Sequence, residues 1–288
     1  MQEPDNKLDI DSFWEYADPA ASEERFRAAL DTAQGDVRLE LLTQIARTYG
    51  LRRRFDEAHA LLNEIESQLA AAGVRPRIHT LLERGRAFNS NGEKEKARGH
   101  FIDAWETAAA AGEEGLAVDA AHMVAITCAG ESGSTAWNER GLAMARQSQD
   151  RKAQSLIPAM LNNGAWDLHD MGRYAEALTW FKAALNEWVA RDQPAQIQIA
   201  KWSLARCLRS LARHQEALTI LRKLEVEHAA AGSEDGYVFE EMAENLAALG
   251  QGDAAKPCFK KAFDALNRDD WFVQNEAQRL SNLASRAK

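Results

Sequence analysis

Small and apolar residues recur along this chain at spacings of three and four residues, as they do on one face of an α-helix. The stretch NNGAWDLHDMGRYAEALTWFKAAL shows a turn followed by a helix with a tightly packed face. The residues that mark this face and its turn are Gly172, Tyr174, Ala177, Phe181 and Ala184. Alternating β-branched residues are nearly absent and proline is rare, so we expect an all-α chain.

The same pattern recurs at a regular interval. The alanines that open the second helix of each unit are separated by 39, 80, 40 and 38 residues, at Ala58, Ala97, Ala177, Ala217 and Ala255. The spacing of 80 is two periods and contains a degenerate unit, in which Ser134 or Trp137 stands where the alanine is expected. A repeat of this length indicates helical hairpins that bury their apolar faces only when stacked.

Small residues and phenylalanines take fixed places in the repeat. Gly85, Ala165, Ala205 and Ala243 lie in the first helices and allow close helix approach, while Phe101, Phe181 and Phe259 fill the space between units. At the hairpin turns, two units carry Arg53 and Ala212 in place of the expected glycine.

These residues resemble the tetratricopeptide repeat family, whose unit is a helical hairpin of about 34 residues. The period here is longer, so longer helices or connections are expected. The resemblance implies an all-α, right-handed superhelical solenoid of six to seven hairpins with a C-terminal capping helix. We expect one domain over 1–288, made of a degenerate N-terminal unit at 9–33, six hairpins at 38–268 and the cap at 270–288.

Glycine and proline predict several helix ends. Three AAAG sequences, ending at Gly73, Gly112 and Gly232, are expected to close helices. Pro76 and Pro194 suit the first turns of the helices that follow.

Charge and composition exclude some classes of function. A net charge of -9 argues against a general nucleic-acid binder, which needs many phosphate contacts from Lys and Arg. No apolar run reaches the length of a membrane span, and the N-terminus is acidic where a secretory signal is basic. We therefore expect a cytoplasmic protein with no nucleic-acid or membrane partner.

The chain carries no recognisable catalytic or metal-binding motif. Cys128, Cys207 and Cys258 are odd in number and far apart, which indicates buried thiols and neither a disulfide nor a metal site. The sequence GQGDAA matches a dinucleotide-binding pattern, but it follows a helix where that pattern requires a strand. We expect no enzyme activity, no metal and no cofactor.

In the resembling family the first helices of the hairpins line a concave groove. Aligning the units on their second-helix alanines places aromatic, apolar and hydrogen-bonding residues at the groove positions. The candidate binding residues are Arg47, Arg86, Asn89, Met123, Asn162, Trp166, His169, Trp202, Arg206, Arg209 and Tyr237. Aromatic side chains would anchor a segment, and arginine and asparagine would donate to its carboxylates or carbonyls.

Two alternatives concern these side chains. Trp166 and Trp202 either face the groove or pack between neighbouring first helices. Arg206 and Arg209 either serve a ligand or pair with Glu240 and Glu244 on the next first helix, and we favour pairing for at least one of them.

The favoured function is non-enzymatic binding of a peptide segment or partner protein in the groove. One alternative is a sensor that binds a small peptide or metabolite and signals to a separate partner. Another is a structural subunit that assembles with copies of itself into a homo-oligomer.

Overall fold

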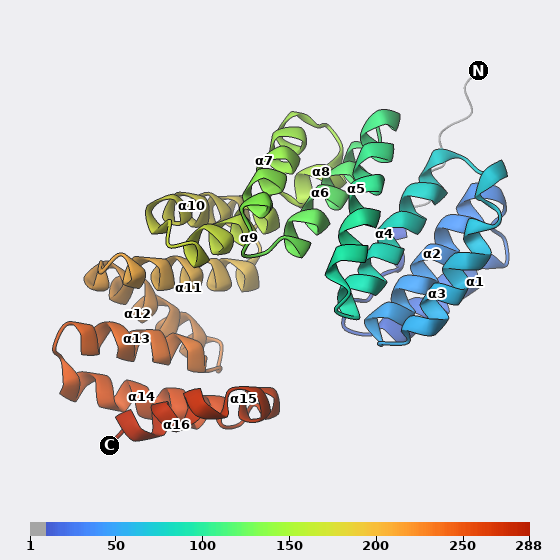
Figure 1. Ribbon diagram of the computed structural model, residues 1–288. Helices are drawn as coiled ribbons and strands as arrows, with labels where there is room; N and C mark the ends of the chain where they lie inside the picture. The colour runs from blue at the N-terminus through green and yellow to red at the C-terminus, as the bar shows by residue number, and fades with distance from the viewer. Residues whose placement is uncertain (1–9) are drawn as a thin grey trace. The chain divides into compact units, whose positions relative to one another are not determined.

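The computed structural model describes residues 10–288, and within this range every regular element is helical (Figure 1). The all-α prediction is therefore confirmed. The chain divides into two compact units, residues up to 160 and residues from 161, which are described separately below. The organisation as a single domain stays a prediction, and Asp9, the first residue of the expected N-terminal unit, lies outside the described residues.

The N-terminal unit begins with a short 3₁₀ turn and one helix, followed by three helical hairpins and a short helix. Helices α2, α4 and α6 are the first helices of its hairpins, and α3, α5 and α7 are the second helices. The elements are η1 (Ile10–Phe13), α1 (Pro19–Leu30), α2 (Gly35–Leu51), α3 (Phe55–Glu66), η2 (Leu69–Ala71), α4 (Val74–Ser90), α5 (Lys94–Ala111), α6 (Glu114–Thr127), α7 (Ser132–Gln147) and α8 (Arg151–Ser155).

The C-terminal unit contains three further hairpins, and the boundary between the units falls inside the first of their helices. Helices α9, α11 and α13 are first helices, and α10, α12 and α14 are second helices. The elements are α9 (Ile157–Asp170), α10 (Tyr174–Ala190), α11 (Pro194–Ser210), α12 (His214–Ala230), α13 (Gly236–Ala248), α14 (Gly252–Leu266), α15 (Asp270–Asn275) and α16 (Ala277–Arg286).

The C-terminal cap differs from the single helix that the sequence predicts. The expected N-cap aspartate is Asp269, whose carboxylate accepts the backbone N–H groups of Trp271 and Phe272. The helix then stops, and a second helix starts after Glu276, whose backbone is not helical. This break lets α16 turn Leu280 and Leu283 into the core beside α14.

The expected repeat packing is present in both units. All five alanines that open the second helices are buried, as are Phe101, Phe181 and Phe259. One close approach is at Gly85 in α4, where an added Cβ would lie 2.5 Å from the Phe101 ring. Small first-helix residues therefore decide how closely each hairpin can close.

The degenerate unit keeps the helix pair but changes the residues at its core. Ser134 is fully buried and takes the place of the alanine, whereas Trp137 packs beside it against Trp105 with ring centroids 5.8 Å apart. Asn138, also fully buried, stands where the other units have a large apolar residue. Gly141 follows, and a Cβ there would lie 2.3 Å from Met160 Cε, so the methionine side chain packs directly on this glycine.

The hairpin turns share one backbone conformation regardless of residue type. Gly92, Gly172 and Gly250 have positive φ angles of 86°, 76° and 73°. Arg53 and Ala212 occupy the same turn position with φ of 61° and 56°, although a side chain disfavours this left-handed region. The turn geometry is thus set by how the two helices pack, and the residues without glycine adopt it under strain.

One expected helix end is wrong. Gly112 ends α5 in the left-handed conformation and Gly232 has a positive φ after α12, as predicted. Gly73, however, precedes α4 as its N-cap residue, with an ordinary negative φ. Its backbone N–H donates to the Asp36 carboxylate at 3.1 Å, which holds the start of α4 against α2. Pro76 and Pro194 do lie in first turns, of α4 and α11.

Candidate functional site

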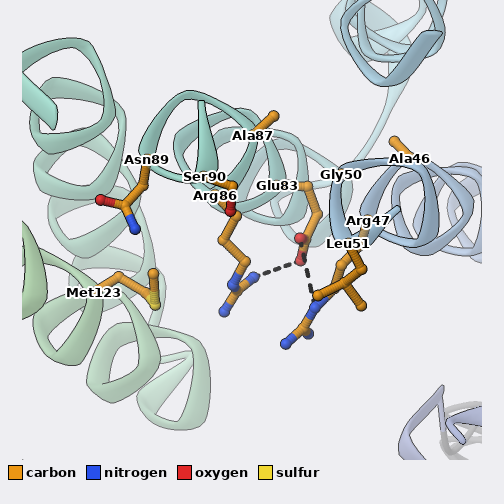
Figure 2. Close-up of a pocket in the computed structure, with 10 residues that line it drawn as sticks. All are labelled: Ala46, Arg47, Gly50, Leu51, Glu83, Arg86, Ala87, Asn89, Ser90 and Met123. Carbon is orange, nitrogen blue, oxygen red and sulfur yellow. Dashed lines mark hydrogen bonds and ion pairs between the residues drawn. The ribbon is translucent and has the colours of Figure 1, made fainter. Parts of the chain in front are cut away.

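The first helices of the N-terminal unit form a pocket of about 220 Å³ (Figure 2). We call the surface formed by α2, α4 and α6 the first-helix face of this unit. The residues around the pocket come from all three helices and are Ala46, Arg47, Gly50, Leu51, Glu83, Arg86, Ala87, Asn89, Ser90 and Met123. Four expected groove residues, Arg47, Arg86, Asn89 and Met123, are therefore brought together here.

Two arginines approach one buried glutamate in this pocket. Figure 2 shows Arg47 and Arg86 reaching Glu83 from opposite sides. Arg86 Nη1 donates to Glu83 Oε1 at 2.5 Å, whereas Arg47 Nε lies 3.9 Å from Glu83 Oε2. Arg86 also reaches α6, where its Nη2 donates to both carboxylate oxygens of Asp119 at 2.7 Å. Arg86 thus ties α4 to α6 and is largely committed to carboxylates of the protein itself.

The ionisation of this pair follows from its surroundings. Burial by itself raises the pKa of Asp119, but the adjacent Arg86 guanidinium outweighs burial and holds the pKa well below its usual range. Burial lowers the pKa of Arg86, and the carboxylates of Asp119 and Glu83 more than compensate, so its pKa is raised. Both groups are therefore charged throughout the physiological range.

Aromatic residues from the N-terminal segment cover Arg47. The rings of Trp14 and Tyr16 stack with centroids 4.9 Å apart. The Arg47 guanidinium carbon lies 5.0 Å from the Trp14 ring centroid and 5.5 Å from that of Tyr16. This cation–π contact positions the Arg47 side chain without using its hydrogen-bond donors.

A second series of polar contacts joins Trp14 to residues of α2 and α4. Trp14 Nε1 donates to Gln44 Oε1 at 3.2 Å, and Gln44 Nε2 lies 3.5 Å from His79 Nδ1. His79 Nε2 in turn lies 3.6 Å from the Glu40 carboxylate. Burial lowers the pKa of His79 well below its ordinary value, aided by nearby basic groups that include Arg75, so the ring is neutral at physiological pH.

The first-helix face of the C-terminal unit, formed by α9, α11 and α13, carries a row of aromatic rings instead. The centroids of Trp166 and Trp202 lie 5.9 Å apart, and those of Trp202 and Tyr237 lie 6.2 Å apart. Tyr237 continues the row to Phe272 of α15 at 5.9 Å. Trp202 Nε1 donates to the Tyr237 carbonyl at 3.2 Å, which joins α11 to α13.

The two tryptophans differ in their role. Trp166 packs edge-on against Phe181 at 5.0 Å and belongs to the packing between helices. Trp202 packs as well, but it also lines a pocket of about 390 Å³ with Ile199 of α11 and Tyr237 of α13. Trp166 is thus a packing residue, whereas Trp202 both packs and lines a pocket.

This second pocket is mainly apolar. Its remaining lining residues are Ala195, Gln198, His228 and Asp235. Asp235 Oδ1 accepts the backbone N–H groups at the start of α13, and its other oxygen lies 3.8 Å from His228 Nε2. The imidazole of His228 and the carboxylate of Asp235 therefore face each other in this pocket.

The arginines of α11 pair with a carboxylate other than the two expected. Arg209 donates to both oxygens of Glu241 at 2.7 and 2.9 Å, and Arg206 Nε lies 3.3 Å from the same carboxylate. Glu240 pairs instead with Arg279, and Glu244 with Arg286, both on α16. Pairing itself was expected, but the expected partners are wrong. Successive residues on a helix point in directions about 100° apart, so Glu241 faces α11 where Glu240 was expected to.

The last two expected groove residues lie on α9. His169 is buried, and its Nε2 lies 2.9 Å from Ser210 Oγ, so its ring is part of the packing between α9 and α11. Asn162 is half-buried near the start of the unit.

Several residues of these sites escaped the sequence analysis. They are Trp14, Glu83, Asp119, Ile199, His228 and Asp235. One signal was available: Asp119 is a lone carboxylate amid the apolar residues of GLAVDAAHMVAIT, which favours a buried ion pair. Nothing in the local sequence marks Trp14, because the partners that place it at the site, Gln44 and Arg47, lie on α2, with Gln44 30 residues away.

The described residues contain no cluster of three or more His, Cys, Asp or Glu side chains suited to a metal ion. The three cysteines are free thiols, and burial raises the pKa of Cys207 to about 11. Over residues 10–288, no helix combines the length and the apolar character needed to cross a membrane.

Comparison with known families identifies one repeat directly. The model for the tetratricopeptide repeat family matches residues 159–189, which cover most of α9 and nearly all of α10. This hairpin is similar to a tetratricopeptide repeat. Four of the other five hairpins share its helix pair, buried alanine and turn conformation, and the fifth has the buried Ser134 in place of the alanine, so the resemblance of the chain to tetratricopeptide repeat proteins is confirmed.

Solved structures show the same fold at low sequence identity. The apo form of RapI is 14% identical and has a TM-score of 0.75, with 96% of this chain and 82% of RapI covered. The apo form of the quorum sensor NprR from B. thuringiensis is 14% identical with a TM-score of 0.62, over 91% of this chain and 74% of that chain. NprR in complex with its cognate peptide NprX is 14% identical with a TM-score of 0.55, over 96% and 81%. Among curated proteins, none matches the sequence.

Proposed function

We propose that this protein binds a peptide segment of a partner protein on its first-helix faces and acts without catalysis. The observation that carries this proposal is the pocket of the N-terminal unit. Four expected groove residues, Arg47, Arg86, Asn89 and Met123, line it from three consecutive first helices. An extended or helical segment that lies across successive helices would meet such a surface along its length.

The two units offer different contacts to a ligand. In the N-terminal unit, Arg47 and Asn89 carry hydrogen-bond donors at the pocket. In the C-terminal unit, Trp202, Tyr237 and Ile199 form an apolar pocket suited to a large apolar side chain. Arg209 is paired with Glu241, so it is unsuited to the ligand-binding role considered for it.

Similarity of fold to NprR, which has been solved with its cognate peptide NprX, supports the choice of a peptide as ligand. The carboxylate–arginine pocket suits the main-chain polar groups of a polypeptide, and the aromatic pocket, considered by itself, suits an apolar side chain. The expected cytoplasmic location and the absence of a nucleic-acid partner stay predictions.

A selection from random displayed peptides on the full-length chain tests the proposal. Selected peptides should bind in a calorimetric titration, and Ile199→Asp should weaken those that use the pocket of the C-terminal unit by about tenfold or more, because it places a charge in an apolar pocket. Val226→Asp is the matched control, since Val226 is 68% exposed and lies outside the pocket, whereas Ile199 is 59% exposed and lines it.

The outcomes separate clearly. Selected peptides that are insensitive to Ile199→Asp would be assigned to the N-terminal unit. Failure to select any binding peptide would contradict the proposed function.

A sensor is the second candidate, and the description of NprR as a quorum sensor favours it. A sensor must change conformation on binding, whereas a scaffold need not. Small-angle scattering of the full chain with and without a selected peptide distinguishes them: a shifted profile supports the sensor. Sedimentation over a range of concentrations tests the self-assembling subunit, which predicts a mass that rises with concentration.

A further inference from the structure

Two polar atoms in the pocket of the N-terminal unit have no hydrogen-bond partner within the described part of the chain. They are Glu83 Oε2 and Arg47 Nε, which lie 3.9 Å apart. Glu83 is only 2% exposed, and its other oxygen is held by Arg86. A buried carboxylate oxygen without a donor is costly, which points to a donor supplied by a ligand.

The charges around the pocket limit what this ligand can be. Arg47 and Arg86 are balanced by Glu83 and by Asp119 behind Arg86, so the cluster carries no net charge. The Glu83 carboxylate would repel an anionic group, and the Arg47 guanidinium would repel a cationic group. A neutral group that carries a donor beside an acceptor can satisfy both.

We infer that this pocket binds an amide, whose N–H donates to Glu83 Oε2 and whose C=O accepts from Arg47. This inference rests on the proposed peptide-binding function. An extended residue presents its main-chain N–H and C=O on the same side, and an asparagine or glutamine side chain presents the same pair. The volume of about 220 Å³ is small for a complete drug-sized ligand, which suits part of a longer chain.

Gly50 allows the pocket to be blocked without disturbing the fold. It lies in α2 and lines the pocket, and an added Cβ would meet no atom within 4 Å. Gly50→Leu should therefore fill the pocket while the better helix former maintains or raises stability. Gly99→Leu is the matched control, because Gly99 is exposed in α5, is equally free of neighbours and lies away from the pocket.

The probe is a peptide selected from a random library on the full-length chain. We expect Gly50→Leu to weaken binding of this peptide about tenfold or more, the effect of losing a hydrogen bond to a charged group, and Gly99→Leu to leave binding unchanged. Unchanged binding by Gly50→Leu overturns the amide inference but leaves peptide binding elsewhere intact. If no peptide can be selected, the proposed function and the inference both fail.

Chemical variants of the peptide identify the amide. Replacing main-chain amides one at a time by esters removes single N–H donors, and replacing Asn or Gln residues by Ala removes side-chain amides. One such change should weaken binding to the wild type and have no further effect in Gly50→Leu. A main-chain source is assigned by the ester series and a side-chain source by the alanine series. If no change shows this dependence although Gly50→Leu weakens binding, the occupant is an apolar side chain and the amide inference is wrong.

Discussion

Arg86 of the N-terminal unit and Trp166 of the C-terminal unit occupy the same place in the repeat, eleven residues before the alanines Ala97 and Ala177. Arg86 is held by two carboxylates, Glu83 on its own helix and Asp119 on the next first helix. Trp166 is held by ring contacts with Phe181, Trp202 and His169. The same repeat position thus links successive hairpins by ion pairs in the N-terminal unit and by packing of aromatic rings in the C-terminal unit.

Ion pairs and aromatic packing can therefore serve at the same repeat position, but they depend on their partners in different ways. A buried ion pair requires both partners, because either one alone leaves a charge without compensation. A row of aromatic rings is less sensitive to the loss of one neighbouring residue, since each ring is stabilised by the apolar area that it buries. The face with ion pairs should therefore respond sharply to the loss of one charge, and the aromatic face to the loss of volume.

The largest effect is expected from Asp119→Ala. This change leaves the Arg86 guanidinium partly buried beside Glu83 alone, and the loss should be about 3 to 5 kcal/mol in the free energy of unfolding. Chemical denaturation of the full chain measures it. Glu216→Ala is the control, because Glu216 pairs with Arg213 in an exposed i,i+3 contact and its removal should leave the midpoint unchanged. An unchanged midpoint for Asp119→Ala would show that Arg86 becomes hydrated.

Trp166→Ala tests the aromatic face. Removing the indole opens a cavity beside Phe181 and Trp202, and we expect a loss of about 3 kcal/mol, at the lower end for buried aromatic residues because Trp166 is only half-buried. Trp271, which is 59% exposed, provides the matched control, and Trp271→Ala should have little effect on the thermal midpoint. Equal effects of the two changes would contradict the packing role of Trp166.

A smaller effect is expected from acidification, and mostly in the N-terminal unit. Burial lowers the pKa of His79, so the unfolded state takes up a proton first as the pH falls. The stability associated with a neutral His79 is therefore complete above about pH 6.5, the unfolded value, and is lost as the pH falls below it. His79→Gln should flatten the decrease in unfolding free energy between neutral pH and about pH 5.

An unaltered slope in His79→Gln would assign the pH dependence to the other histidines whose pKa is lowered chiefly by burial. Three of these lie in the N-terminal unit and one in the C-terminal unit: His59, His100, His122 and His169.

The smallest effect is expected at a hairpin turn. Ala212 has a φ of 56°, and Ala212→Gly removes about 1 to 2 kcal/mol of strain in the left-handed region. Glycine costs about 0.5 to 1 kcal/mol more in backbone entropy, so the net gain should be about 0.5 kcal/mol. The reverse change, Gly172→Ala, should lower the thermal midpoint at the equivalent turn. A lower midpoint for Ala212→Gly would mean that the strain is already relieved.

Much of the fold could be predicted from the sequence because the same spacing of small and apolar residues recurs in several units. Ala58, Ala97 and Ala177 are buried where the spacing placed them, and even Ala212 and Arg53 take the backbone conformation of the missing glycines. The degenerate unit was located by its period although its core residue, Asn138, departs from the pattern. Gly73 shows the limit of this reasoning, because a helix end and a helix start both accept glycine.

The candidate site was less accessible to sequence reasoning. The spacing identified Arg47, Arg86, Asn89 and Met123 as neighbours on one face, and these four do line one pocket. It assigned Arg209 to the wrong glutamate and counted His169 among the groove residues, although His169 is buried. Both errors concern the direction of one side chain, which depends on the rotation of a helix against its neighbour.

The sequence by itself determined the helical hairpins, their register and the small residues at their contacts, because these depend on periodicities within and between short segments. Only the tertiary structure decided which charges meet. Asp119 lies 33 residues from Arg86 and Glu241 lies 32 from Arg209, so their pairing depends on how one hairpin stacks on the next. Ion pairs and hydrogen bonds are sensitive to shifts well below one helical turn, whereas burial of an apolar face tolerates them, and so the repeat pattern specifies the core but not the chemistry of its surface.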